Sequence, residues 1–209
     1  MDNKQTPLQI KGIKNSLYGG FWLRLGALLL DGIFVLPVAY LSLYLNSFGK
    51  NIYFLTIIPT LLFTLWYGIF LPKRYGGTPG KLAVGLKIIR LDGEAIGWKE
   101  SILRYSIDFV ISLFSVILMT VSILNADDSI YTNISWLKQS LYLTSLAPFF
   151  FKIYTWINNI WVYGELIVLL TNKRKRAIHD FIAGTVIVKS KYIDQIRQTI
   201  QEDEQSGCL

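Results

Sequence analysis

Two charged side chains stand inside a long apolar segment near the start of the chain, and this feature constrains the fold most strongly. Arg24 and Asp31 lie seven residues apart in the run 23–45, which is otherwise almost entirely apolar. A helix of about 20 apolar residues spans the roughly 30 Å hydrocarbon core of a bilayer. A charge near the bilayer centre costs about 2.5–3.5 kcal/mol on insertion scales, so it normally faces other helices and finds a partner.

The composition indicates an integral membrane protein. Of the 209 residues, 52% are hydrophobic and only 17% are charged, below the roughly 25% that is typical of soluble domains. The mean hydropathy is +0.41. Length and apolarity predict an all-α membrane protein built as a four-span transmembrane helical bundle. The expected spans are residues 23–45, 52–71, 105–124 and 141–171.

Lys and Arg are distributed unevenly between these spans. They gather in the link 72–104 and in the segment after the fourth span, whereas the loops on the opposite side carry only Lys50 and Lys138. Because Lys and Arg favour cytoplasmic loops, we expect the link and both termini to be cytoplasmic. The net charge of +7 then reflects contact with the lipid bilayer, and we do not expect a nucleic-acid partner.

The cytoplasmic link has the pattern of a small β-sheet. Residues 82–91 are rich in strand formers, and an Asp-Gly pair gives a hairpin signal before a second candidate strand at 95–98. Residues 185–189 are a third candidate strand. We therefore expect a small cytoplasmic β-hairpin or sheet element. The tail segment 192–204 is predicted to be an amphipathic helix that lies on the inner membrane surface or packs on the protein.

Four blocks of residues, taken in order, resemble the RDD family of small prokaryotic membrane proteins. The resemblance extends over roughly residues 19–189, which would form a transmembrane domain between a cytoplasmic N-terminal segment, 1–18, and a cytoplasmic tail, 190–209. Its blocks are Gly-Phe-Trp-Leu-Arg at 20–24 with Asp31 and Gly32, Gly-Thr-Pro-Gly-Lys at 77–81 with Gly-Leu-Lys at 85–87, Arg104 with Asp108, and Arg-Ala-Ile-His-Asp at 176–180 with Ala-Gly-Thr at 183–185.

The resemblance implies a multi-pass protein of the bacterial cytoplasmic (inner) membrane. The family has been suspected of transporting unidentified ligands, and some members resemble cation/proton antiporters. Arg24 and Asp31 match the arginine and the aspartate of the family's first helix. The family's second aspartate matches either Asp108 or Asp180.

The charged groups of the first and third spans are expected to lie at comparable depths. Both spans enter from the cytoplasm, so Arg24 and Arg104 start at a similar level. On helical rise, Asp31 lies about 10 Å deeper than Arg24, and Asp108 lies about 6 Å deeper than Arg104. Ion pairs that cross between the two helices are therefore sterically feasible.

Further polar groups follow at the cytoplasmic end of the fourth span. Glu165 lies near that end, and His179 and Asp180 lie just beyond it. This arrangement predicts a polar vestibule that faces the cytoplasm. The candidate ion- or proton-binding carboxylates are Asp31, Asp108 and Glu165, their charge partners are Arg24 and Arg104, and His179 with Asp180 forms a cytoplasmic motif.

Two roles stay open for Asp31. A carboxyl group in a low-dielectric site can exchange a proton for an ion. Alternatively, Asp31 is half of a buried ion pair that locks helices together. For Asp108, four residues after Arg104, pairing along the helix is favoured.

At the level of the whole chain, transport of an ion or small solute is the leading hypothesis. The alternative is a non-transporting accessory, scaffold or assembly subunit, with either a second copy or another membrane protein as partner.

The sequence offers no cofactor or metal site that we can assign. His179 is the single histidine and Cys208 the single cysteine, so neither a multi-histidine metal site nor an intrachain disulfide is expected. Residues 76–82 resemble a phosphate-binding loop, but the glycine spacing is wrong and Leu82 stands where such loops need Ser or Thr. No nucleophile and base pair can be proposed, so we do not expect an enzyme.

Overall fold

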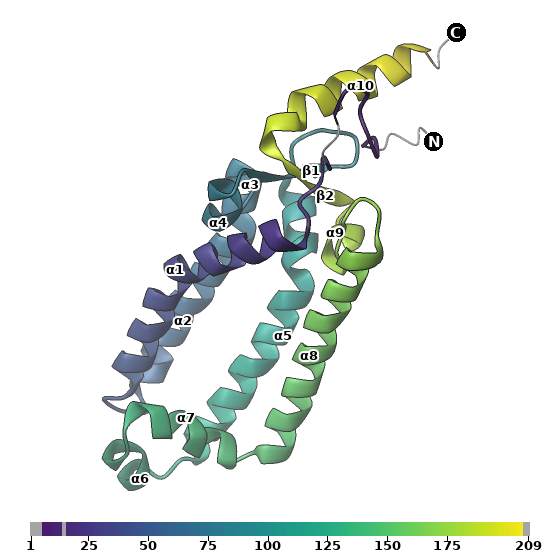
Figure 1. Cartoon of the computed structure of the whole chain (residues 1–209). Coiled ribbons are helices and arrows are strands. Elements are labelled where there is room, and N and C mark those ends of the chain that lie inside the picture. Colours follow the sequence, from purple (N-terminus) through teal and green to yellow (C-terminus); the bar gives the residue numbers. More distant parts are fainter. Residues whose placement is uncertain (1–5, 14–15, 207–209) are drawn as a thin grey trace. The chain divides into compact units, whose positions relative to one another are not determined.

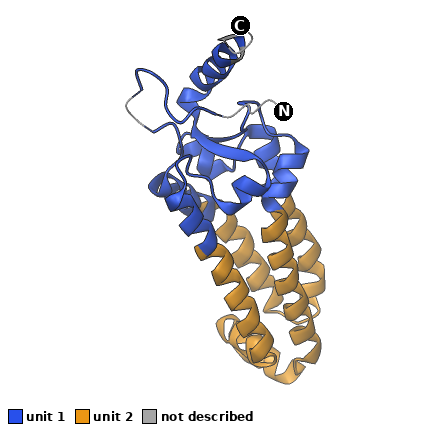
Figure 2. Ribbon diagram, turned by 90° about the vertical axis from the view of Figure 1, so that its right-hand side faces the viewer, with its two compact units in different colours: residues 1–32, 66–105, 164–209 blue, residues 33–65, 106–163 orange. Residues whose placement is uncertain are grey.

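A computed structural model describes residues 6–13 and 16–206 of the chain (Figure 1). Four helical stretches in it are long and apolar enough to cross a membrane, which confirms the predicted four-span helical class. They are α1 (Phe21–Asn46), the stretch Ile52–Ala83, α5 (Trp98–Asn125) and α8 (Pro148–Thr171). The protein is therefore a multi-pass membrane protein. Its contacts divide the chain into two compact units, 1–32 with 66–105 and 164–209, and 33–65 with 106–163 (Figure 2).

The second and fourth helical stretches differ from the expected spans. The second continues past residue 71 as a series of short helices. The fourth begins later than residue 141, because the chain breaks between two helices before Pro148, and the residue before a proline disfavours helical geometry. The second stretch comprises α2 (Ile52–Leu65), the π-helical η1 (Trp66–Phe70), α3 (Leu71–Tyr75) and α4 (Pro79–Ala83), and α6 (Asp128–Asn133) and α7 (Trp136–Ser145) precede α8.

A two-stranded antiparallel sheet lies in the unit that contains both ends of the chain. It pairs β1 (Leu86–Arg90) with β2 (Thr185–Lys189). The expected strand at 95–98 does not form, and Ala95 makes only an isolated bridge. The reason is that the Gly97 N–H donates to the Glu100 carboxylate at 2.8 Å, which caps the start of α5 instead of extending a sheet.

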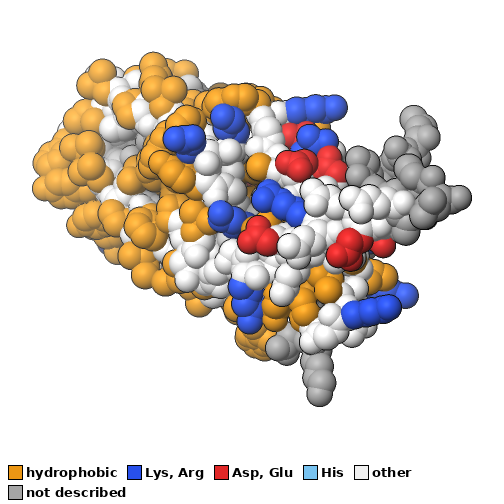
Figure 3. All heavy atoms as spheres, turned by 90° about the horizontal axis from the view of Figure 1, so that it is seen from above, with side chains coloured by type: hydrophobic (Ala, Val, Ile, Leu, Met, Phe, Trp, Pro, Cys, Tyr) orange, Lys and Arg blue, Asp and Glu red, His pale blue; other side chains and the backbone are white. Residues whose placement is uncertain are grey.

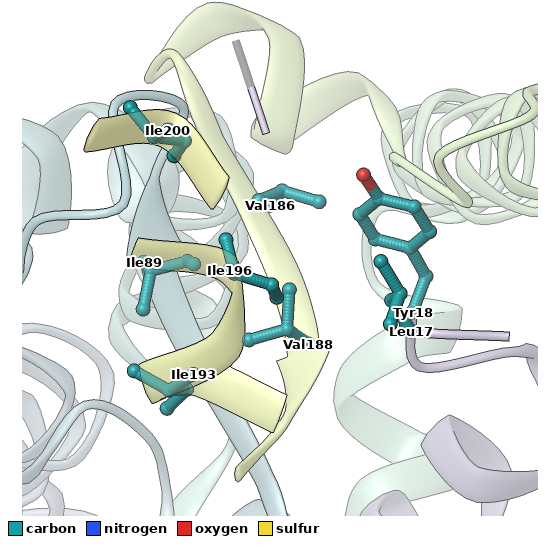
Figure 4. Packing of buried hydrophobic residues seen from close by; sticks show 8 residues of the cluster. All are labelled: Leu17, Tyr18, Ile89, Val186, Val188, Ile193, Ile196 and Ile200. Atoms are coloured by element: carbon teal, nitrogen blue, oxygen red, sulfur yellow. The ribbon is translucent and has the colours of Figure 1, made fainter. Parts of the chain in front are cut away.

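The last helix of this unit covers the sheet. It is α10 (Ile193–Ser206), preceded by the 3₁₀ turn η2 (Ser190–Tyr192). Its Ile193, Ile196 and Ile200 are buried with Val186 and Val188 of β2 (Figure 4). The amphipathic tail therefore forms a helix. Its apolar face packs on the protein, which is one of the two locations that we expected for it.

The second unit contains most of the apolar helical length. Its buried cluster includes Tyr53 of α2, Ile123 of α5 and Tyr131 of α6. The buried Gln139 side chain of α7 donates to the Tyr131 carbonyl at 2.9 Å, so the short helices are tied to each other by a satisfied polar contact. Most other large apolar side chains of this unit are exposed, as expected where lipid tails are the solvent.

Candidate functional site

Asp31 in α1 is held by neutral hydrogen-bond donors. It is 8% exposed. Its Oδ1 accepts hydrogen bonds from the Tyr67 hydroxyl at 2.5 Å and from the Gly80 N–H at 2.7 Å, and its Oδ2 accepts one from the Thr78 hydroxyl at 2.6 Å. Both carboxylate oxygens are therefore satisfied without a direct cation among these contacts, and Asp31 is not the partner of Arg24.

The turn before α4 is shaped to receive this carboxylate. Thr78 is extended, as a residue before proline favours, and Pro79 takes the first helical position. The Gly80 N–H, like others in a first turn, has no partner within its own helix and donates to Asp31 instead. A Cβ atom on Gly80 would lie 2.2 Å from the Ala27 carbonyl oxygen, so only glycine permits this approach.

Lys81 links the Asp31 group to a set of buried charges. Its Nζ donates to the Thr78 hydroxyl at 3.3 Å, and this hydroxyl is the one that donates to Asp31. Lys81 also interacts electrostatically with Arg104, with the Asp31 carboxylate itself, and with Arg24 and Asp180. The Lys81 ammonium is therefore linked to the Asp31 carboxylate through the Thr78 hydroxyl. A proton can move along these two hydrogen bonds.

A second carboxylate, Asp180 of α9 (Ile178–Ile182), lies between two arginines. It is fully buried. Arg24 of α1 donates to its Oδ2 at 3.1 Å, and Arg104 of α5 donates to its Oδ1. The Ala177 N–H also donates to Oδ2, at 2.9 Å. Burial by itself would raise the pKa of Asp180, but the charges of Arg104, His179 and Arg24 and the Ala177 hydrogen bond outweigh it and hold that pKa well below its usual range.

Arg176 fixes the helix that carries Asp180 to the adjoining strand. Its Nη2 donates to the Asp180 carbonyl oxygen and its Nε to the Thr185 carbonyl oxygen, both at 2.9 Å. Its guanidinium also lies 4.0 Å from the centre of the Phe181 ring. Three backbone and ring contacts from one side chain therefore set the position of the Asp180 carboxylate.

Glu165 and His179 form a third polar contact. The His179 Nδ1 lies 2.6 Å from Glu165 Oε2, and the His179 N–H donates to Glu165 Oε1 at 2.8 Å. The His179 Nε2 is 3.7 Å from Asp180 Oδ1. The C-terminal end of α8 is thus bonded to α9, and His179 lies between the Glu165 and Asp180 carboxylates.

Asp108 has different surroundings. It belongs to the unit that contains residues 106–163, where it accepts a hydrogen bond from Trp161 Nε1 at 2.8 Å. Arg104, one turn before Asp108 in α5, donates to Asp180 and, at 2.5 Å, to the Thr185 hydroxyl, and its pairing with Asp108 stays a prediction. Of the two aspartates that match the family's second one, Asp180 is the one bonded to Arg24.

Sequence reasoning missed three groups that complete the Asp31 site: Tyr67, Thr78 and Lys81. Tyr67 lies in a π-helical turn, which has no clear signature in the sequence. Thr78 and Lys81 flank the Pro-Gly pair of the second block, and their signal was a polar cluster at the end of an apolar span. Within residues 6–13 and 16–206, no three His, Cys, Asp or Glu side chains lie close enough together to hold a metal ion.

The sequence of the chain is similar to that of a known protein family and to that of one bacterial protein. A sequence model of the RDD family matches residues 18–184. The uncharacterized protein YxaI of Bacillus subtilis (strain 168) is 29% identical over 109 residues, which cover 41% of this chain and 72% of that protein. No solved structure matches the chain significantly.

Proposed function

The chain belongs to the RDD family, and from that premise we propose that it transports an ion or small solute across the membrane in exchange for a proton carried by Asp31. The observation that supports this most is the set of neutral donors around the Asp31 carboxylate. Such a carboxylate can take up a proton without breaking an ion pair. Asp180, between Arg24 and Arg104, cannot do so without leaving two buried arginines uncompensated.

The proposed exchange uses the groups that already contact Asp31. The ionised carboxylate accepts three hydrogen bonds, and the protonated form can donate one to a hydroxyl that reorients. Oxygen atoms of Asp31, Tyr67 and Thr78 converge there, and oxygen ligands suit hard cations. Lys81 supplies a proton path through Thr78. The transported cation would replace the proton at the carboxylate, which gives exchange with fixed stoichiometry.

The proposal predicts that Asp31→Asn abolishes exchange while the protein stays folded. The asparagine oxygen can still accept from Tyr67 and Gly80, because both bonds end on the same oxygen, and its amide can donate to the Thr78 hydroxyl. The titratable proton and the negative charge of the carboxylate are lost, while the hydrogen-bond partners are kept. Cation-triggered proton flux in proteoliposomes, with sodium, potassium and lithium in turn, should fall to the level of empty vesicles, and thermal unfolding should confirm that the variant is folded.

The matched control is Asp128→Asn, which removes a carboxylate whose side chain is 72% exposed, and its flux should equal that of the native chain. Equal flux in the native chain and in Asp31→Asn would remove Asp31 from the mechanism. If the native chain carries no flux with any of the three cations, cation/proton exchange is excluded.

A second candidate function is that of a non-transporting accessory, scaffold or assembly subunit. The observation in its favour is that both oxygens of Asp31 and both oxygens of Asp180 accept hydrogen bonds, as in a structural lock. Co-purification of a different membrane protein in stoichiometric amount, together with absence of flux, would support this function over transport.

We further propose that the protein lies in the bacterial inner membrane with both termini in the cytoplasm, as the distribution of Lys and Arg indicates. Cys208, the single cysteine, lies outside the described residues but serves as a probe. A membrane-impermeant maleimide should label it in inside-out vesicles and not in intact cells. In a Cys208→Ser background, Asn133→Cys at an exposed position should give the opposite pattern. Labelling of Cys208 in intact cells would contradict this orientation.

A further inference from the structure

A pocket of about 340 Å³ lies in the unit that contains the sheet, and none of its lining residues belongs to the contacts of Asp31 and Asp180 described above. Its lining comes from α3, β1, η2 and α10 and from residues 95–96. The volume is at the lower end of the range of small-molecule sites, about 300–1,000 Å³. The pocket is thus large enough for a compact ligand.

Positive charge dominates the lining of this pocket. Lys73, Arg74, Lys87 and Arg197 contribute basic side chains, whereas Asp194 is the one acidic residue among the described residues of the lining. Within the described part of the chain, none of Lys73, Arg74 and Lys87 forms an ion pair with a carboxylate. Arg197 is oriented by a hydrogen bond from its Nε to the Gly93 carbonyl oxygen at 3.0 Å.

The pocket lining includes residues that follow the apolar part of a helical stretch long enough to cross a membrane. Lys73 and Arg74 belong to α3, which follows the apolar part of the stretch Ile52–Ala83. The Lys73 ammonium lies 5.0 Å from the centre of the Trp98 ring, and Trp98 is 50% exposed at the start of α5. Trp and Lys at the ends of spans mark the level of the lipid headgroups. Lys and Arg side chains are also visible on the face shown in Figure 3.

From this concave, basic lining at headgroup level, we propose that the pocket binds a phosphate-bearing anion. Phosphate offers several acceptor oxygens to converging Lys and Arg donors, and its binding would break no ion pair of Lys73, Arg74 or Lys87 among the described residues. The phosphate can belong to an anionic lipid headgroup or to a soluble compound. Anion binding in this pocket does not require transport. Its test is therefore independent of the test of the function proposed above.

The test compares a pocket variant with a variant of equal charge. Arg74→Gln with Lys87→Gln removes two exposed pocket cations, whereas Lys99→Gln with Lys191→Gln removes two exposed cations that do not line the pocket. Native mass spectrometry of the full chain in detergent measures binding of phosphatidylglycerol, with phosphatidylcholine as the uncharged comparison. Equilibrium dialysis with radiolabelled inorganic phosphate measures binding of the free anion.

We expect saturable binding to the native chain that weakens about 25-fold in the pocket variant, from about fivefold for each basic side chain at a membrane surface. The control variant should bind like the native chain. Loss in the phosphatidylglycerol arm alone identifies a lipid headgroup as the source of the phosphate, and loss in the inorganic phosphate arm identifies a soluble anion. Equal weakening in both variants, or no saturable binding in either arm, overturns the proposal.

Discussion

Replacing Asp180 with asparagine is expected to lower the free energy of unfolding by about 3–5 kcal/mol, because the change leaves two buried arginines without a compensating charge. The Arg24 and Arg104 side chains that it neutralises are only 11% and 8% exposed. The amide nitrogen of asparagine would also face one of the two guanidinium groups. Thermal unfolding in detergent should show a melting temperature lower by about 10 °C.

Two comparisons make this prediction specific. Asp194→Asn, at an exposed position of α10, should change stability by less than about 0.5 kcal/mol. Adding Arg104→Met to Asp180→Asn should recover part of the loss, since it removes one of the uncompensated charges. An unchanged melting temperature in Asp180→Asn alone would show that the two arginines are neutralised by other groups.

The same ion pairs give a defined pH dependence. The pKa of Asp180 is lowered in the folded protein from its ordinary value of 3.8. A carboxylate with a lowered folded pKa contributes its full stability above the unfolded pKa and loses it as the pH falls below that value. The difference in stability between the native chain and Asp180→Asn should therefore be constant near neutral pH and shrink below about pH 4.

Replacing Gly80 with alanine is expected to cost about 3 kcal/mol, at the upper end of the range for overpacking. The added Cβ would lie 2.2 Å from the Ala27 carbonyl oxygen and 2.7 Å from Asp31 Cγ, and both belong to the rigid helix α1. The start of α4 must then move away from α1. That movement breaks the bonds from Gly80 and Thr78 to Asp31, so exchange flux should fall together with the melting temperature.

A glycine one residue from Asp31 provides the matched control. Gly32 also lies in α1, but a Cβ there would meet nothing within 4 Å. Gly32→Ala should therefore be neutral or stabilise the helix by up to about 1 kcal/mol. If Gly80→Ala and Gly32→Ala unfold at the same temperature, the close packing of α4 on α1 does not limit stability.

Much of the fold follows from patterns that are local in the sequence. Apolar length is enough to locate four spans, and the spacing of Ile193, Ile196 and Ile200 is enough to predict α10. The strand predicted at 95–98 fails because one side chain, Glu100, caps the following helix and ends the extended segment. A single capping contact can override β-propensity over a few residues.

The partners of the charged residues could not be predicted in the same way. Depth along the helices brings Arg24 and Arg104 to one level, but it does not say which carboxylate reaches them. The carboxylate that does, Asp180, is 156 residues from Arg24 in sequence. The sequence singles out Asp31 as a buried carboxylate. Its three contacts come from neutral groups whose positions depend on a π-helical turn and a proline turn. Such contacts depend on tertiary structure and leave no periodic pattern in the sequence from which they could be predicted.

The order of synthesis gives the Asp180 contacts a consequence for how the protein is made. All four spans leave the ribosome before Asp180 does, and Asp180 follows Arg104 by 76 residues and Arg24 by 156. During insertion, both arginines are therefore without the carboxylate that neutralises them in the finished protein. Strand β1 likewise emerges long before its partner β2. The unit that contains the sheet closes only when the end of the chain arrives, so a prematurely terminated chain carries two arginines without their carboxylate and a strand without its partner.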